Sequence, residues 1–98
     1  MTSSRNLADL TAAVLPEIVK RAESLAAMTP NLPEPLFTVG VQKTLGILWA
    51  RGSRRASINL QTNEMLLCLS GDNEGMHMIQ VDPQRMGIYI DRIASWLG

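Results

Sequence analysis

The sequence predicts an α+β fold: an N-terminal helix, a four-stranded antiparallel meander and a C-terminal helix. Three observations support this prediction. Residues 45–82 form short apolar or alternating segments separated by turn residues. On either side of this stretch, apolar residues recur at spacings of three and four, as in amphipathic helices. The 98 residues suffice for one small hydrophobic core, so we expect a single domain over residues 1–98.

The composition is that of an ordinary globular protein. Hydrophobic residues make up 46% of the chain and charged residues 18%, which argues against disorder. The formal net charge is zero, so no overall field draws the protein to nucleic acid or membranes, and repulsion between copies is weak. Cys68 is the single cysteine, and no segment resembles a signal peptide or a membrane span. We therefore expect a cytoplasmic protein without a membrane partner.

The first predicted helix covers about residues 5–28. Its apolar stripe comprises Leu7, Leu10, Val14, Ile18, Ala22 and Leu25. Pro16 interrupts this stripe, because proline lacks the N–H that a helix interior needs and costs about 3 kcal/mol there. Since the stripe stays in phase through Pro16, we favour one kinked helix. The alternative is a short helix to about Val14 and a second helix that begins near Pro16.

A proline-rich connector follows at residues 29–35. We expect an extended backbone there, because proline fixes its own φ and keeps the preceding residue out of the helical region. Residues 36–39 then either add an edge strand or simply pack Phe37 against the core.

The central meander is defined by its side-chain pattern. Its four strands are expected at residues 45–50, 56–61, 65–70 and 76–81. The second strand alternates apolar and polar residues, which is typical of a half-buried strand, and the third is nearly all apolar, which is typical of a central strand. Turn-forming residues occupy positions 62–63 and 71–75.

These turns set a register, and the register assigns each side chain to one of two faces. We expect Ser57 opposite Cys68 and Leu69 opposite His77. The face predicted to be the core comprises Ala56, Ile58, Leu60, Met65, Leu67, Leu69, Ile79 and Val81, with His77 at its margin. The second face comprises Ser57, Asn59, Gln61, Leu66, Cys68, Ser70, Met76, Met78 and Gln80.

The second predicted helix covers about residues 83–97. Asp82 followed by Pro83 is a strong start signal, because it combines an N-cap with proline at the first helical position. The apolar stripe comprises Met86, Ile90, Ile93 and Leu97. Gly87 weakens this helix, so the alternative is a fifth strand at residues 86–90.

No combination of residues predicts catalysis or metal binding. Cys68 and His77 are the only thiol and the only imidazole, but the register places them on opposite faces of adjacent strands. One cysteine and one histidine without clustered carboxylates cannot complete a metal shell. Residues 71–75 are too short for a calcium-binding loop. We therefore expect a protein that is not an enzyme and that holds no metal or cofactor.

Two surfaces remain as candidate sites. The first is an apolar patch with a polar rim on the second face of the sheet, formed by Leu66, Cys68, Met76 and Met78. Trp49 joins this patch if the first hairpin loop has an odd number of residues, or the core if the number is even. The second is a basic hairpin tip with the chemistry to contact phosphates or an acidic partner, formed by Arg51, Arg54 and Arg55.

These surfaces predict a binding protein. We expect a small protein-binding module with an accessory, inhibitor or chaperone-like role, as in bacterial or phage accessory proteins, that acts as a homodimer through the apolar patch. Either the N-terminal helix or another subunit covers the second face of the sheet. The alternative function is a nucleic-acid-binding module that uses the arginine tip. Zero net charge and the lack of an aromatic platform argue against that alternative.

Overall fold

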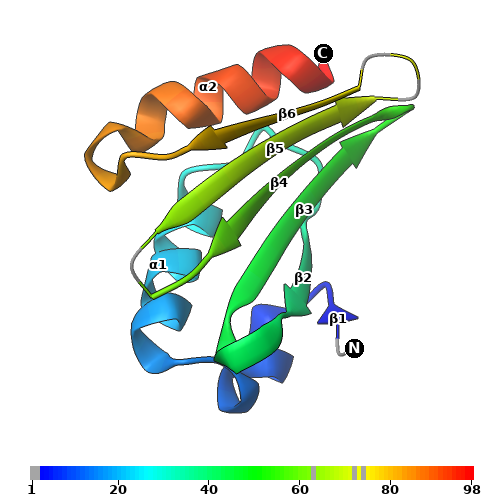
Figure 1. Ribbon diagram of the computed structural model, residues 1–98. Helices are drawn as coiled ribbons and strands as arrows, with labels where there is room; N and C mark the ends of the chain where they lie inside the picture. The colour runs from blue at the N-terminus through cyan, green and yellow to red at the C-terminus, as the bar shows by residue number, and fades with distance from the viewer. Residues whose placement is uncertain (1–2, 63, 72, 74) are drawn as a thin grey trace.

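The computed structural model describes residues 3–62, 64–71, 73 and 75–98 of the chain. These residues form an antiparallel sheet of six strands that is flanked by helices (Figure 1). The strands cross the sheet in the order of the chain, so each one pairs with its neighbours in sequence. Their bounds are β1 Ser3–Ser4, β2 Leu36–Val39, β3 Leu45–Arg51, β4 Arg54–Leu60, β5 Met65–Gly71 and β6 Gly75–Gln80.

The predicted α+β class is confirmed, but the prediction of four strands is incomplete. β2 pairs with β3, and the two-residue β1 pairs with β2, which gives six strands. β2 also buries Phe37, so the segment both extends the sheet and packs its aromatic ring. A short 3₁₀ turn, η2 (Val41–Lys43), connects β2 to β3.

The predicted register of the meander is confirmed. β4 and β5 pair with Ser57 opposite Cys68, and β5 and β6 pair with Leu69 opposite His77. The turn at residues 62–63 has the expected width, because the Gln61 N–H donates to the carbonyl oxygen on the far side of the turn at 3.0 Å. Position 63 itself, like positions 72 and 74 of the longer turn, lies outside the described residues.

The hairpin between β3 and β4 turns through two residues, Gly52 and Ser53, with Arg51 opposite Arg54. Gly52 has a φ of 63°, in the left-handed region that glycine enters without steric cost. Two-residue hairpins favour such conformations because they match the twist of the strands. The loop therefore has an even number of residues, which decides the faces of all the β3 side chains.

The N-terminal segment is divided in two at Pro16, so the prediction of one kinked helix is wrong. A 3₁₀ helix, η1, covers Leu7–Ala13, and an α-helix, α1, covers Pro16–Ala27. Between them Val14 and Leu15 are extended, with ψ of 146° and 137°. Proline disfavours the helical conformation in the residue before it and needs no N–H partner in a first turn, so it begins a new helix.

The C-terminal segment forms a helix as predicted, and the alternative of a fifth strand at residues 86–90 is wrong. A 3₁₀ turn, η3 (Pro83–Arg85), leads into α2 (Met86–Leu97). The Asp82 side chain accepts a hydrogen bond from the Gln84 N–H at 3.0 Å, as an N-cap does.

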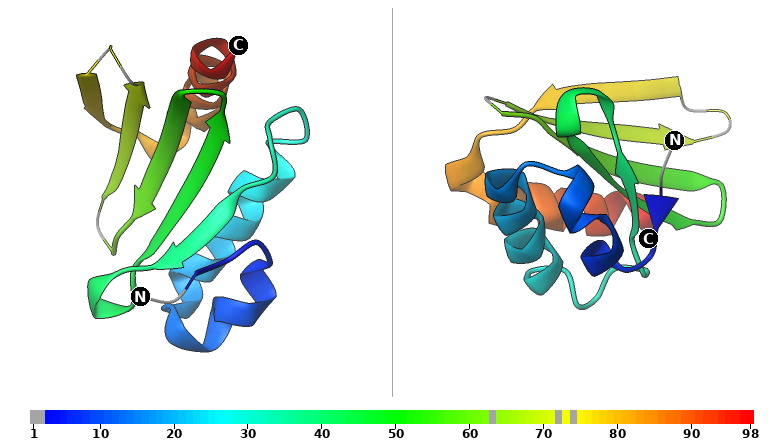
Figure 2. Two further views of the ribbon diagram at one scale, coloured as in Figure 1. Left: turned by 90° about the vertical axis from the view of Figure 1, so that its right-hand side faces the viewer. Right: turned by 90° about the horizontal axis from the view of Figure 1, so that it is seen from below.

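The helices η1, α1 and α2 all lie on one face of the sheet, as the view from below in Figure 2 shows. Both α1 and α2 pack against β4. The buried side chains of the helices and of the sheet form one apolar cluster, and its largest fully buried members are Trp49, Leu10, Ile18, Leu45, Ile47, Ile58, Leu60, Leu67 and Ile93. The N-terminal helix therefore belongs to the core side and does not cover the second face of the sheet.

Candidate functional site

The face of the sheet that is turned away from the helices, called the outer face below, consists of the residues that alternate with the core residues. The register aligns these residues in rows across the strands. One row comprises Leu36, Leu48, Ser57, Cys68 and Met78. A second row comprises Thr38, Gly46, Asn59, Leu66 and Gln80. A third row comprises Ala50, Arg55, Ser70 and Met76.

The four residues of the predicted apolar patch lie together on this outer face. Leu66 and Cys68 are half-buried on β5. Met76 and Met78 lie on the neighbouring β6 with 66% and 61% of their surface exposed. Cys68 is directly opposite Met78 in the β5–β6 ladder. Exposed apolar groups that are contiguous in this way are typical of protein interaction sites.

Sequence reasoning missed Leu36 and Leu48, which extend this apolar surface onto β2 and β3. Both are half-buried, and they lie opposite each other in the β2–β3 ladder. The signal that could have found Leu48 is its position between Ile47 and Trp49, because adjacent strand residues point to opposite faces. The length of the first hairpin loop was needed to choose between those faces.

Trp49 is not part of this surface, and its inclusion among the partner-binding residues is wrong. Its side chain is 0% exposed and belongs to the core cluster, opposite Ala56 in the β3–β4 ladder. The two-residue hairpin loop satisfies the even-number condition under which the sequence places Trp49 in the core. Its indole Nε1 is buried without a hydrogen-bond partner among the described residues.

The outer face carries almost no charge. Arg55 is the only charged side chain among the described strand residues that point to it, and none of these residues is aromatic. Proteins that bind single-stranded nucleic acid on a sheet stack bases on aromatic side chains above a basic surface. The outer face lacks both features, so its chemistry suits a protein surface better than a nucleic acid.

The three arginines of the predicted basic tip do not act together. Arg51 and Arg54 occupy core-side positions at the end of the β3–β4 hairpin and point toward the end of α2. The Arg51 guanidinium donates to the Gly98 carbonyl oxygen at 2.9 Å, and Arg54 donates to the Trp96 carbonyl oxygen at 2.9 Å. Carbonyl groups at a helix C-terminus lack partners within the helix, so cations are favourable there.

Arg54 and Trp96 form a second contact, because the guanidinium lies 4.7 Å from the centre of the indole ring. The Trp96 Nε1 in turn donates to the backbone oxygens of Arg55 and Ser70, at 3.1 and 3.3 Å. Two of the three arginines therefore fasten α2 to the sheet. Only the Arg55 side chain is turned to the outer face, so the structure contains no three-arginine phosphate site at this hairpin.

Cys68 and His77 are on adjacent strands but on opposite faces. Cys68 lies on the outer face, whereas His77 pairs with Leu69 on the helix side. There the imidazole meets the Trp96 ring edge to face, with 6.1 Å between the ring centres. This arrangement separates the thiol from the imidazole, so the two side chains do not form a nucleophile–base pair.

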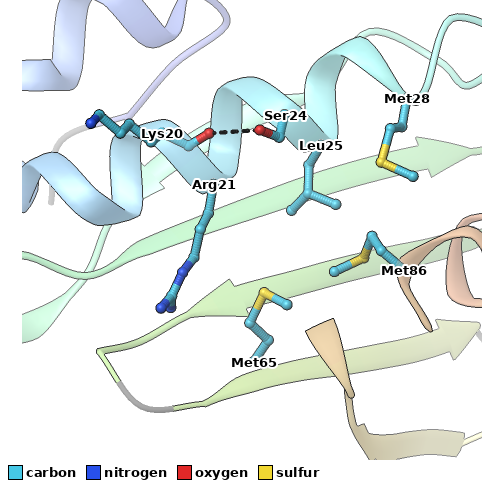
Figure 3. Close-up of a pocket in the computed structure, with 7 residues that line it drawn as sticks. All are labelled: Lys20, Arg21, Ser24, Leu25, Met28, Met65 and Met86. Carbon is cyan, nitrogen blue, oxygen red and sulfur yellow. Dashed lines mark hydrogen bonds between the residues drawn. The ribbon is translucent and has the colours of Figure 1, made fainter. Parts of the chain in front are cut away.

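A pocket of about 290 Å³ lies between α1, the start of β5 and the start of α2 (Figure 3). The apolar side chains that point into it are Leu25, Met28, Met65 and Met86. Arg21 bounds it on one side and donates to the Gln61 carbonyl oxygen at 3.2 Å. The volume is at the lower limit for sites that enclose a small molecule, and the lining offers few polar groups to orient one.

The fold and the outer face together define a small α+β protein whose sheet is covered by helices on one side only. Comparison of the chain with protein-family models, curated proteins and solved structures gave no match. Among the described residues there is no group of three or more histidine, cysteine or acidic side chains that could hold a metal ion. None of the described helices is both long and apolar enough to cross a membrane.

Proposed function

We propose that this protein is a small non-enzymatic binding module that docks another protein on the outer face of its sheet and works as a homodimer. The observation that carries this proposal is the one-sided packing of η1, α1 and α2. Because these helices share one face, the apolar residues of the other face have no cover within the described chain.

The composition of the outer face supports a docking role. An antiparallel sheet with one solvated face normally presents polar side chains to water. Here the row of Leu36, Leu48, Ser57, Cys68 and Met78 is apolar at four of its five positions. Removing apolar surface from water contributes about 25 cal/mol per Å², and a standard interface buries roughly 800 Å² on each partner. A partner that covers the rows of the outer face would therefore bind with useful affinity.

The lack of charge on this face indicates the kind of partner. Because Arg55 is the one charged residue among the described strand residues of the outer face, this face offers little long-range attraction to a strongly acidic or basic molecule. Methionine side chains are flexible and adapt to irregular apolar surfaces. These properties suit an accessory, inhibitor or chaperone-like protein that recognises an apolar, hydrogen-bonding protein surface.

A charge placed at the centre of the outer face tests the proposal. Leu66→Lys puts an ammonium group between Asn59 and Gln80 and would have to be desolvated by any docked protein. Ala27→Lys is the matched control, because Ala27 is exposed at the end of α1 on the helix side. Both variants should keep the circular dichroism spectrum and the thermal unfolding of the wild type.

The measurement is the affinity for a protein captured from the native host and then purified. We expect Leu66→Lys to weaken that binding by at least about tenfold and Ala27→Lys to leave it unchanged. If a purified partner binds wild type and Leu66→Lys equally well, the outer face is not the docking surface and the proposal is wrong.

A further inference from the structure

Strand β6 forms a free edge of the sheet. It pairs with β5 on one side, and no described strand lies on its other side (Figure 1). The opposite edge is β1, which is only two residues long, whereas β6 has six residues. The helix α2 packs against β4 on the core side of the sheet, where its Trp96 also meets His77 of β6. A long free edge is a template for pairing with another strand.

One hydrogen bond fixes which residues of β6 bond inward. The Val81 N–H donates to the Met65 carbonyl oxygen at 2.8 Å. Along an antiparallel pair, residues that exchange hydrogen bonds with the neighbouring strand alternate with residues that do not. Ile79 and His77, at spacings of two from Val81, therefore bond to β5.

The remaining residues of β6, Met76, Met78 and Gln80, direct their backbone N–H and C=O groups away from the sheet. Among the residues that the structure describes, none forms a hydrogen bond with these groups. Their side chains are the same ones that lie on the outer face. The open backbone edge is thus continuous with the apolar surface of the proposed docking face.

The edge also lacks the features that protect free strands. Proteins usually guard such edges with lysine or other charged residues, proline, bulges or very short strands. From Gly75 to Gln80, β6 has no charged residue and no proline, and it pairs with β5 without a bulge. By contrast, β1 is protected by its shortness. An unguarded edge in a chain of zero net charge favours a second copy of the same chain as the occupant.

We propose that β6 pairs antiparallel with β6 of a second copy, so that the two sheets join into one. This inference deepens the proposed function, because it names the strand through which the homodimer forms, and it rests on that function for the homodimer itself. It leaves the outer faces of both copies free and places them side by side.

The spacing of the outward groups fits a twofold axis. When the axis passes through Met78, this residue lies opposite its own copy, and Met76 lies opposite Gln80 of the other copy. Each such pair exchanges two hydrogen bonds, so all the outward groups of Met76, Met78 and Gln80 find partners at once. No other centre within the strand pairs all three residues.

The side chains agree with this register. On the outer face, Met78 packs beside Met78 of the other copy, and no like charges meet within the described strand Gly75–Gln80. On the helix side, Ile88 is 63% exposed and lies one turn before Arg92, which with His77 lines the space between α2 and β6. Ile88 therefore gives α2 an exposed apolar side chain.

The first test separates backbone pairing from side-chain packing. Met78→Pro removes an N–H that points away from β5, and proline is tolerated at such edge positions. Met78→Ala keeps the N–H and removes most of the side chain. Sedimentation velocity over a wide concentration range should show a wild-type dimer, a dissociation constant raised at least about 100-fold by Met78→Pro, and a change within about tenfold for Met78→Ala.

A second pair of variants tests the register without proline. Met76→Lys with Gln80→Lys sets like charges opposite each other across the twofold axis, whereas Met76→Lys with Gln80→Glu sets opposite charges there. The first double variant should dissociate and the second should remain dimeric, although each carries two new charges. Amide hydrogen exchange adds a direct readout, because Met76, Met78 and Gln80 should gain protection as the wild-type concentration rises.

Several results would overturn the inference. A wild type that stays monomeric at every concentration excludes it, as does equal dissociation by Met78→Pro and Met78→Ala or by both charge variants. If the dimer survives these changes and Leu66→Lys dissociates it, the copies meet through their outer faces instead. If the β6 variants behave as expected while Leu66→Lys still binds a partner normally, the edge pairing stands and the proposed docking face is wrong.

Discussion

The two faces of strand β5 carry similar apolar side chains but differ in how deeply those side chains are buried. Met65, Leu67 and Leu69 point toward the helices and are buried, and Leu66 and Cys68 between them are half-buried on the outer face. All five residues are apolar or nearly so. The difference in burial therefore arises because helices pack against the inner face of β5, whereas no described helix packs against its outer face.

This contrast shows that the apolar pattern of a strand does not identify what covers each of its faces. A nearly continuous apolar strand predicts cover on both faces. Among the residues that the structure describes, only one face of β5 has cover, which leaves the other to a partner or to water. Substitutions on the two faces therefore separate residues that stabilise the fold from residues that are available for binding.

The largest expected difference is between two adjacent leucines. Leu67→Ala removes a fully buried side chain from the centre of the core and should lower the free energy of unfolding by about 2–5 kcal/mol. Leu66→Ala removes the same atoms from the outer face and should cost less than about 1 kcal/mol. Urea unfolding at one fixed protein concentration measures both values. Equal losses would show that the outer face is as well packed as the core.

The next difference is between two adjacent arginines at the β3–β4 hairpin. Arg54→Ser removes the hydrogen bond to the Trp96 carbonyl oxygen and the cation–π contact with its ring, and it should cost about 1–2 kcal/mol. Arg55→Ser should change stability by less than about 0.5 kcal/mol, because its side chain is exposed and its backbone oxygen still accepts from Trp96.

Thermal and urea unfolding of the two serine variants check this expectation. The comparison also bears on function. If the basic tip were purely solvated, Arg54→Ser and Arg55→Ser would both leave the free energy of unfolding almost unchanged. If Arg54→Ser changes stability as little as Arg55→Ser does, the guanidinium of Arg54 does not fasten α2, and the tip is available for an external ligand.

Much of the sheet could be predicted from the sequence because local signals agree there. Alternation in residues 56–61 and the turns on either side of β5 fix a register that a one-residue slip would invert. The pairing of Ser57 with Cys68 and of Leu69 with His77 follows directly. The same register gave the four members of the predicted patch their common face.

Other features depend on interactions that no local pattern shows. The apolar stripe runs in phase through Pro16, so periodicity could not reveal that Val14 and Leu15 are extended. The polar strand β1 has no apolar signal of its own and exists because β2 offers it an edge. Arg51 and Arg54 meet carbonyl groups more than forty residues away in sequence, which a hairpin motif cannot predict.

The last prediction concerns Trp49, the residue whose face the sequence left open. Its indole is 0% exposed, and Nε1 has no hydrogen-bond partner among the described residues, which leaves a desolvated donor in the core. An unsatisfied buried donor costs about 1–3 kcal/mol. Trp49→Phe removes that donor together with part of the ring, so the lost packing and the relieved desolvation should nearly cancel. We expect a net change below about 1 kcal/mol, against about 3–5 kcal/mol for Trp49→Ala. Urea unfolding of both variants measures the two losses in the free energy of unfolding. A phenylalanine variant as unstable as the alanine variant would show that the indole N–H has a hydrogen-bond partner in solution.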